Sequence, residues 1–226
     1  AVITEERISA FINSFDKGNT PFLDEIERFA LENRIPVIRQ ETQSLLKLLL
    51  AIKQPGQILE VGTAIGFSAL LMSEYGPEGC KITTIEKYEK RIPQALENFR
   101  RAGKEEAITL LAGDASAILK ELKGPYDFVF MDAAKGQYIH FLPDILRMMP
   151  WGGMLVSDNV LKGGEIMESR YAVVRRDRTI HSRMREYLYE LKHNEQLETA
   201  ILPVGDGVTV SVRKYTDGRY TGSQKD

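Results

Sequence analysis

The sequence has a single cysteine, Cys80, among its 226 residues. An internal disulfide is therefore excluded, and a reducing compartment is expected because proteins of such compartments seldom carry disulfides. No apolar run approaches the ~20 residues that a membrane-spanning helix needs, and the first residues lack the apolar segment of a secretory signal. We therefore expect a cytoplasmic protein that makes no contact with a membrane.

An excess of one charge is also missing. The formal net charge is −2 and the sequence pI is about 6.1, so overall charge does not indicate a nucleic-acid-binding protein. Hydrophobic residues make up 43% and charged residues 27%, the balance of a globular protein with a core of ordinary size. We expect a single domain over residues 1–226, with a helical segment at 1–56, an α/β core at 57–213 and a polar, flexible tail at 214–226.

The first fifty residues are expected to be helical. Apolar residues at helical spacing predict helices at 4–15, 21–33 and 41–53. The second of these begins with Thr20 as the N-cap and Pro21 in the first turn, where proline is well tolerated.

From residue 57 the pattern changes to short strands that alternate with helices. The strands are rich in Val, Ile, Leu and Phe, which favours a parallel sheet covered by helices on both faces. The predicted strands are 58–61, 81–85, 108–111, 128–131 and 154–157, and the helices between them are 67–75, 88–101, 115–122 and 138–149.

The C-terminal part is expected to contain a glycine-containing loop at 162–164 and a long helix to about residue 194. Two strands follow, 200–204 and 208–212, around Gly205-Asp206-Gly207. A short glycine-rich connection of this kind is typical of a hairpin between antiparallel strands.

Three successive strand ends carry residues suited to a nucleotide. Open parallel sheets bind ligands outside the carboxyl ends of their strands. The first strand leads into a turn with Gly62 and Gly66, where backbone can approach a ligand closely. The second ends in Glu86, placed to grip a ribose diol, and the third in Gly113-Asp114-Ala115, suited to an adenine edge. Turn and cap roles explain each feature singly, but not all three together, so we predict an adenosine-containing ligand.

The next two strands end in oxygen-bearing side chains. Asp132 follows the fourth strand, and Asp158 and Asn159 follow the fifth. Two carboxylates and an amide oxygen suit Mg²⁺, Ca²⁺ or Mn²⁺ rather than zinc. Lys135 lies three residues after Asp132, where it could exchange a proton beside a cation, although an ordinary exposed helix lysine is the alternative. Three histidines lack metal-ligand spacing and are interpreted as surface or core residues: His140, His181 and His193.

A dense group of arginines follows this predicted metal site. Its members are Arg170, Arg175, Arg176, Arg178, Arg183 and Arg185. Such a group could hold RNA phosphates, and Arg175, Arg176 and Arg178 are the candidate RNA-binding residues. The alternative is a solvated helix face paired with nearby acidic residues, namely Glu165, Glu168, Asp177 and Glu186.

Three stretches carry a resemblance to a known family. They are ILEVGTAIGFS at 58–68, MDAAKGQY at 131–138 and SDNV at 157–160. Together they resemble the metal-dependent class I S-adenosylmethionine O-methyltransferases, a group that includes the catechol and caffeoyl-CoA O-methyltransferases. The resemblance implies a Rossmann-like, seven-stranded, mostly parallel sheet with extra N-terminal helices, in which the final hairpin inserts an antiparallel strand.

The resemblance also assigns roles to single residues. It implies that the methyl donor S-adenosylmethionine contacts Ile38, Gly62, Thr63, Ser68, Glu86, Asp114, Ala115 and Asp132. It implies that Asp132, Asp158 and Asn159 bind Mg²⁺ or another hard divalent cation. Lys135 and Asp132 would be the catalytic residues beside the reacting oxygen.

Within that group the sequence motifs are most similar to those of the bacterial tRNA 5-hydroxyuridine methyltransferases. The shared stretches are DAAKGQY at 132–138, SDNVL at 157–161 and TAILPVGDG at 199–207, whereas 162–171 departs from their pattern. This likeness implies a homodimer that methylates 5-hydroxyuridine at the tRNA wobble position to 5-methoxyuridine.

Other functions stay open at this point. A small catechol or phenol would meet the same chemistry, because it also offers two neighbouring oxygens to one metal ion. An NAD-dependent oxidoreductase would use a similar sheet but leaves Asp132, Asp158 and Asn159 without a role. A purely non-catalytic RNA-binding role is equally disfavoured.

Overall fold

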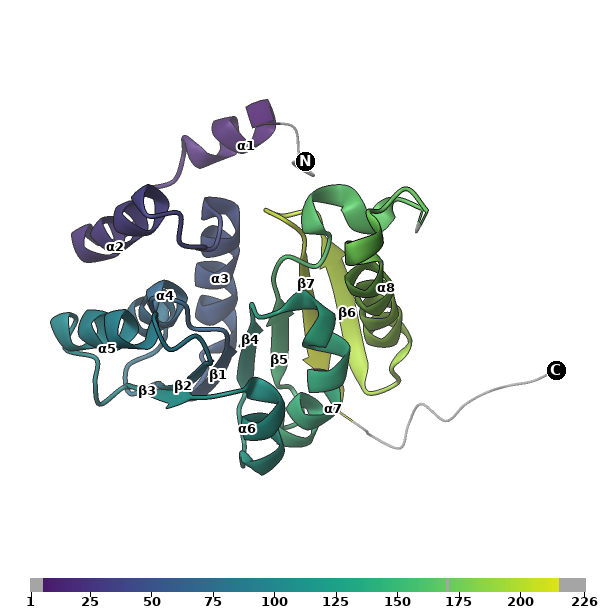
Figure 1. Cartoon of the computed structure of the whole chain (residues 1–226). Coiled ribbons are helices and arrows are strands. Elements are labelled where there is room, and N and C mark those ends of the chain that lie inside the picture. The colour runs from purple at the N-terminus through teal and green to yellow at the C-terminus, as the bar shows by residue number, and fades with distance from the viewer. Residues whose placement is uncertain (1–5, 170, 216–226) are drawn as a thin grey trace.

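A seven-stranded sheet runs through the middle of the molecule in the order β3-β2-β1-β4-β5-β7-β6 (Figure 1). The computed structural model describes residues 6–169 and 171–215. The sheet consists of β1 (Gln57–Val61), β2 (Lys81–Glu86), β3 (Ile108–Ala112), β4 (Phe128–Met131), β5 (Met154–Ser157), β6 (Leu197–Leu202) and β7 (Val208–Arg213). The first five strands are parallel, and β7 lies antiparallel between β5 and β6. The expected Rossmann-like α/β sheet, including its inserted final hairpin, is confirmed.

Helices cover both faces of the sheet (Figure 1). One face carries α3 (Gln40–Lys53), α4 (Phe67–Tyr75) and α5 (Ile92–Arg101), with α2 (Pro21–Glu32) packed on α4. The other face carries α6 (Ala115–Glu121), α7 (Tyr138–Met148) and α8 (Arg178–His193). Three short 3₁₀ helices lie between these elements. They are η1 (Lys135–Gln137), which precedes α7, and η2 (Lys162–Met167) and η3 (Arg175–Asp177), which precede α8.

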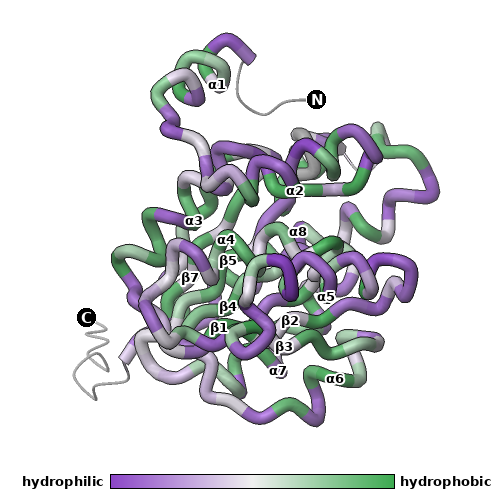
Figure 2. The backbone as a smooth tube through the Cα atoms, turned by 90° about the vertical axis from the view of Figure 1, so that its left-hand side faces the viewer, coloured by the Kyte–Doolittle hydropathy of each residue, from purple (hydrophilic) through white to green (hydrophobic). Residues whose placement is uncertain are grey.

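The strands divide their side chains between two cores, because successive residues of a strand point to opposite faces. Phe128 and Phe130 of β4 belong to the core under α3 and α4, whereas Val129 and Met131 belong to the core under α7 and α8. All four are fully buried, and the central strands form the hydrophobic middle of the molecule (Figure 2). Within the described residues, no helix has the length and apolar character needed to cross a membrane.

The first helix differs from the others in burial. The predicted helix at 4–15 is present as α1 (Glu6–Asn13), and none of its residues is buried. Its apolar residues are exposed, with Phe11 at 65% and Ile12 at 56% of their accessible surface, and Phe15 just after the helix is exposed as well. The helix predicted from the spacing is therefore confirmed, but no described part of the chain covers its apolar face.

Two predicted boundaries move for identifiable reasons. The long helix before residue 194 begins only at Arg178, after η2 and η3, and Gly164 has a left-handed backbone (φ 95°) inside this irregular stretch. Strand β6 begins at Leu197 rather than 200, because Leu197 is buried and the Thr199 hydroxyl donates to Leu191 O of α8 at 2.8 Å. Of the expected tail, residues 216–226 lie outside the described part of the chain.

The turn after β1 gives a test of close packing. Gly66 has φ 87°, and an added Cβ would lie 2.4 Å from Cε1 of Phe99. Gly79 has a similar φ of 80°, but an added Cβ would meet nothing within 4 Å. We expect Gly79→Ala to cost about 1–2 kcal/mol of unfolding free energy through backbone strain alone. Gly66→Ala should cost a further 1–3 kcal/mol, roughly, through overpacking. Urea denaturation of both variants measures the difference, and equal costs would show that Phe99 moves aside freely.

Candidate active site

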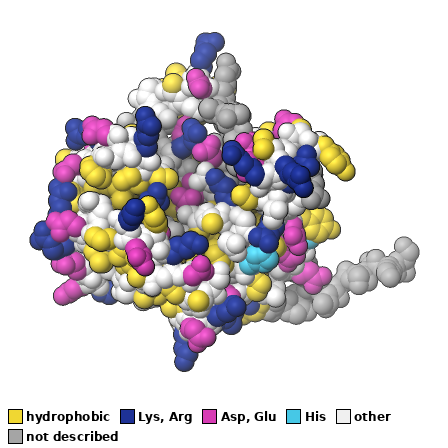
Figure 3. Space-filling view, viewed as in Figure 1, with side chains coloured by type: hydrophobic (Ala, Val, Ile, Leu, Met, Phe, Trp, Pro, Cys, Tyr) yellow, Lys and Arg dark blue, Asp and Glu magenta, His cyan; other side chains and the backbone are white. Residues whose placement is uncertain are grey.

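A cavity of about 830 Å³ opens at the carboxyl ends of the five parallel strands. Its walls include the turns that follow β1 to β5, and further residues come from 36–39, α8 and the β6–β7 turn. In Figure 3 it lies in the hollow near the centre of the face, with acidic side chains in its depth and basic ones around it. The structure brings all the predicted donor, metal and catalytic residues to this cavity: Ile38, Gly62, Thr63, Ser68, Glu86, Asp114, Ala115, Asp132, Lys135, Asp158 and Asn159.

The turn after β1 passes directly against the turn after β4. Gly62 has φ 105°, and an added Cβ would lie 2.1 Å from the backbone oxygen of Asp132. Ala64 also has a left-handed backbone, with φ 48°, and the Asn98 amide of α5 donates to Ile65 O at 2.8 Å. The turn is therefore fixed on both sides, which holds its backbone at the cavity wall.

Glu86 is held by backbone donors at the end of β2. The Ala64 N–H donates to its Oε2 at 2.7 Å, and the Tyr88 N–H donates to its Oε1 at 2.8 Å. Each carboxylate oxygen has a second lone pair, so the group can still accept two hydroxyl protons from a ligand. This geometry fits the predicted grip on a ribose diol.

Asp114 has a structural role as well as its predicted one. Its carboxylate caps α6 by accepting from the Ser116 N–H at 2.8 Å, and Lys87 lies 3.5 Å away. These contacts lower the pKa of Asp114, the Ser116 hydrogen bond most of all. Asp114 thus caps α6 and also lines the cavity. The cap explains why the residue is there, and it leaves the carboxylate able to contact a ligand.

Ser68 and Thr63 belong to a buried hydrogen-bond network beneath the cavity. Ser68 donates to Glu60 Oε1 and Thr84 to Glu60 Oε2, both at 2.5 Å, and the Thr63 and Thr84 hydroxyl oxygens are also 2.5 Å apart. Burial raises the pKa of Glu60 to about 7, against the opposing effect of these two donors. While Glu60 is ionised, the Ser68 hydroxyl is committed as a donor, and its oxygen is left to accept.

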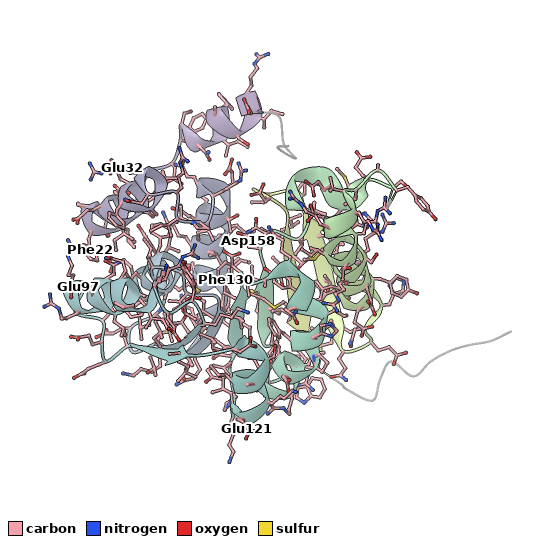
Figure 4. All side chains as sticks on the ribbon, in the orientation of Figure 1. Phe22, Glu32, Glu97, Glu121, Phe130 and Asp158 are labelled. Carbon is pink, nitrogen blue, oxygen red and sulfur yellow. The ribbon has the colours of Figure 1, made fainter. Side chains whose placement is uncertain are left out.

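The oxygen cluster lies at the ends of β4 and β5. Asp158 is 2% exposed, and Figure 4 places it beyond Phe130 at the end of the sheet. The Asn159 amide donates from Nδ2 to Asp132 Oδ1 at 3.0 Å, with Asp158 Oδ2 at 3.5 Å. The buried Tyr138 hydroxyl joins the two turns, because it contacts Asp158 O at 3.1 Å and accepts from the Ala133 N–H at 3.2 Å.

Negative charge in this cluster is poorly compensated by the protein. Burial, followed by the charge of Asp132, raises the pKa of Asp158 to about 7, and burial also raises the pKa of Asp132. Asp206 adds to both effects from the β6–β7 turn, while Lys135 opposes them. A hard cation fits such a donor set.

The fit of a metal depends on Asn159. Within the described ranges, no group of three His, Cys, Asp or Glu side chains could hold a metal ion. A metal held by Asp132 and Asp158 would therefore take the amide oxygen of Asn159 as its third protein ligand. The amide must then turn so that its oxygen rather than Nδ2 faces the cluster, and the two atoms differ only by a flip.

Lys135 and the candidate RNA residues occupy different places. Lys135 begins η1 and lines the cavity. Arg175, Arg176 and Arg178 lie in η3 and at the start of α8, outside the cavity wall, and Arg178 Nε donates to Val173 O at 3.2 Å. Arg170 lies outside the described residues.

Several cavity residues were given no site role from the sequence, among them Arg39, Ile180 and Asp206, and Arg183 was named only as a member of the arginine group. Ile180 and Arg183 are three apart in α8, a spacing that places both on one helix face. Arg39 and Asp206 form an ion pair with 2.9 Å between Nε and Oδ2, across 167 positions of sequence. Asp206 is the acidic centre of the Gly205-Asp206-Gly207 turn, a signal that was read only as a hairpin.

The sequence profile of the O-methyltransferase family matches residues 13–214. The chain belongs to this family. A catechol O-methyltransferase of Mycobacterium tuberculosis is 32% identical over 164 residues, covering 71% of this chain and 74% of that protein. A caffeoyl-CoA O-methyltransferase of Stellaria longipes is 29% identical over 180 residues, covering 76% and 73%.

Solved structures agree with the assignment. A methyltransferase of Podospora anserina, determined with S-adenosylhomocysteine (SAH) bound, superposes with a TM-score of 0.83 at 25% identity and covers 93% of this chain and 95% of that one. The expected S-adenosylmethionine-dependent O-methyltransferase is confirmed at this level. The oxidoreductase and the purely RNA-binding interpretations are set aside. The roles of the individual site residues stay predictions.

The position of Glu86 gives a test of donor binding. Glu86→Ala should weaken SAH binding by about 10- to 100-fold, since hydrogen bonds to a charged group contribute roughly 1.5–3 kcal/mol. Isothermal titration calorimetry measures the affinity, with exposed Glu89→Ala, which does not line the cavity, as the matched control. Unchanged SAH affinity in Glu86→Ala, or tight binding of NADH by the unaltered protein, would contradict the assignment of the ribose site.

Proposed function

We propose that this enzyme methylates 5-hydroxyuridine at the tRNA wobble position, with Mg²⁺ or another hard divalent cation at Asp132, Asp158 and Asn159. One observation supports the reaction and the metal site in this proposal. A single cavity has adenosine-type residues at the ends of β1 to β3 and an oxygen cluster at the ends of β4 and β5. The donor and a hydroxyl beside the cluster would then lie next to each other, as methyl transfer requires.

Different residues of the cavity would bind the donor and assist the proton transfer. Glu86 and the β1 turn would fix the adenosine, and Ile38, which is 4% exposed, would cover the donor from the segment before α3. Holding donor and acceptor in one geometry removes much of the entropic barrier to their reaction. Lys135 would either accept the proton of the hydroxyl or stabilise the oxyanion that forms, because it lines the cavity and its charge acts on Asp132 and Asp158.

A bound dication would lower the pKa of a coordinated hydroxyl and neutralise the buried carboxylates. Asp132 and Asp158 would hold it, and Asn159, whose left-handed backbone (φ 61°) turns its side chain toward them, would complete the protein ligands. A substrate that offers two neighbouring oxygens suits such a site. The 5-hydroxyl and adjacent carbonyl of 5-hydroxyuridine meet this requirement.

A small catechol is the second candidate substrate, and the named relatives support it directly. One of them is a catechol O-methyltransferase that is 32% identical to this chain. The support for tRNA is different, because it rests on the resemblance of three sequence stretches and on the arginines between 170 and 185. A homodimer in the cytoplasm belongs to the same proposal, and the exposed apolar face of α1 offers it a surface.

Removing the metal or a ligand should separate catalysis from donor binding. We expect EDTA to abolish methyl transfer, and Asp158→Asn to weaken Mn²⁺ binding more than about 100-fold, the upper range for loss of an outer-shell partner. SAH affinity should be nearly unchanged in Asp158→Asn, whereas Asp132→Asn should reduce both affinities. Electron paramagnetic resonance of free Mn²⁺ and calorimetry of SAH measure the two. Full turnover in EDTA would show that the cluster is structural.

Salt dependence should identify the substrate. With tRNA carrying 5-hydroxyuridine, activity should fall steeply as salt is added. In a plot of the logarithm of the binding constant against the logarithm of the salt concentration, each neutralised phosphate should add about 0.7–0.9 to the downward slope. Replacing Arg175 and Arg176 together by alanine should raise the KM for tRNA and reduce that slope by roughly one to two. Catechol methylation in the same preparation is the control and should respond to neither change. Efficient catechol turnover with inert tRNA would replace the tRNA proposal by the small-molecule one.

A further inference from the structure

Arg183 reaches the cavity from α8 and contacts η1, the 3₁₀ turn that follows β4. It lines the cavity together with Ile180, and its Nη1 donates to the Gly136 carbonyl oxygen at 3.2 Å. Gly136 directly follows Lys135 in η1, and a Cβ at Gly136 would lie 3.6 Å from Ile180 and 3.9 Å from Arg183 Nη1. The guanidinium is therefore held against the backbone of η1, at the residue that follows Lys135.

The rotation of α8 that presents Arg183 is fixed by buried neighbours. Tyr187, one turn further along, is fully buried, and its hydroxyl lies 2.7 Å from the Ser157 hydroxyl at the end of β5. Met184, beside Arg183, is also fully buried. Residues three and four apart lie on the same helix face, so Arg183 shares the face of α8 that carries Tyr187, and it lines the cavity there with Ile180.

Arg183 differs from Arg39, another arginine of the cavity wall. Arg39 is neutralised by Asp206 at 2.9 Å. Within the part of the chain that the structure describes, neither Arg183 nor Lys135 has a carboxylate within 4 Å. Both side chains line the cavity without a direct ion pair to a described carboxylate, although the charge of Lys135 acts on Asp132 and Asp158 from further away.

We propose that Arg183 binds a phosphate ester of the substrate, next to the ring whose hydroxyl is methylated. A guanidinium has five N–H donors in a planar fork, and among the described residues Arg183 uses one of them, for Gly136 O. The others can take two oxygens of one phosphate, and the bond to Gly136 orients the fork beforehand. This subsite deepens the proposed function and rests on it. It is separate from Arg175, Arg176 and Arg178, which do not line the cavity.

The experiment compares substrates that differ by one phosphate. The probes are 5-hydroxyuridine and its 3′- and 5′-monophosphates, with kcat and KM measured for the unaltered enzyme and for Arg183→Gln. We expect Arg183→Gln to raise the KM of at least one monophosphate about tenfold or more, as loss of a charge-assisted contact predicts. The KM of the unphosphorylated nucleoside should change by less than about twofold, and Arg183→Lys should give an intermediate effect.

The same helix offers a matched control. Arg185 Nη1 donates to Ile166 O at 3.2 Å, so Arg185→Gln removes an arginine with a similar backbone bond that does not line the cavity. Arg185→Gln should alter neither KM, and both variants should keep the SAH affinity of the unaltered enzyme. An equal rise of KM for nucleoside and monophosphates in Arg183→Gln would assign Arg183 to support of η1 and overturn the proposal. No change in any KM would overturn it too.

Failure of the proposed substrate can be recognised separately. If no form of 5-hydroxyuridine is methylated while catechol is, the tRNA function is wrong, and inhibition of catechol methylation then tests Arg183. Uridine 5′-monophosphate should inhibit more strongly than uridine, and Arg183→Gln should remove the difference. Equal inhibition of the unaltered enzyme by the two compounds would overturn the phosphate subsite.

Discussion

The backbone contact between the β1 turn and the β4 turn determines where everything else in the site can lie. Gly62 passes so close to the carbonyl oxygen of Asp132 that no side chain fits between them. Because β1 and β4 are also neighbours in the sheet, the donor-binding turn and the oxygen cluster share one wall. The order of the strands and the absence of a Cβ at Gly62 would bring the two reacting groups together without a conformational change.

That arrangement concentrates buried negative charge. Asp132, Asp158 and Glu60 lie within one region, and burial raises the pKa of each. Uncompensated buried charge is costly, so the site has a free-energy reason to take up a cation or protons. Glu60 is satisfied by hydroxyl donors from Ser68 and Thr84, whereas the aspartates face the cavity with few donors of their own. The same carboxylates that destabilise the free fold are thereby suited to ligand binding.

Residues at strand ends could be predicted from the sequence, and those on packed helices could not. Glu86 and Asp158 follow apolar strands, and parallel strands must end at one edge, so their convergence follows from the pattern. Arg183 comes from a helix whose rotation depends on Tyr187 packing under β5, a tertiary contact with no local sign. The arginine-dense stretch was recognised as a group, but the residue that enters the cavity was not among those selected. For α1, periodicity predicted the helix without saying whether its apolar face is covered.

The ion pair between Arg39 and Asp206 joins parts of the chain that are 167 positions apart. The pair is partly exposed, with 45% of the Arg39 side chain and 25% of the Asp206 side chain accessible, so it contributes only about 0–1 kcal/mol. This edge of the cavity should therefore open and close far more readily than the sheet below it unfolds. Ligands could be exchanged through local fluctuation at this pair while the seven strands, and the geometry they impose, stay intact.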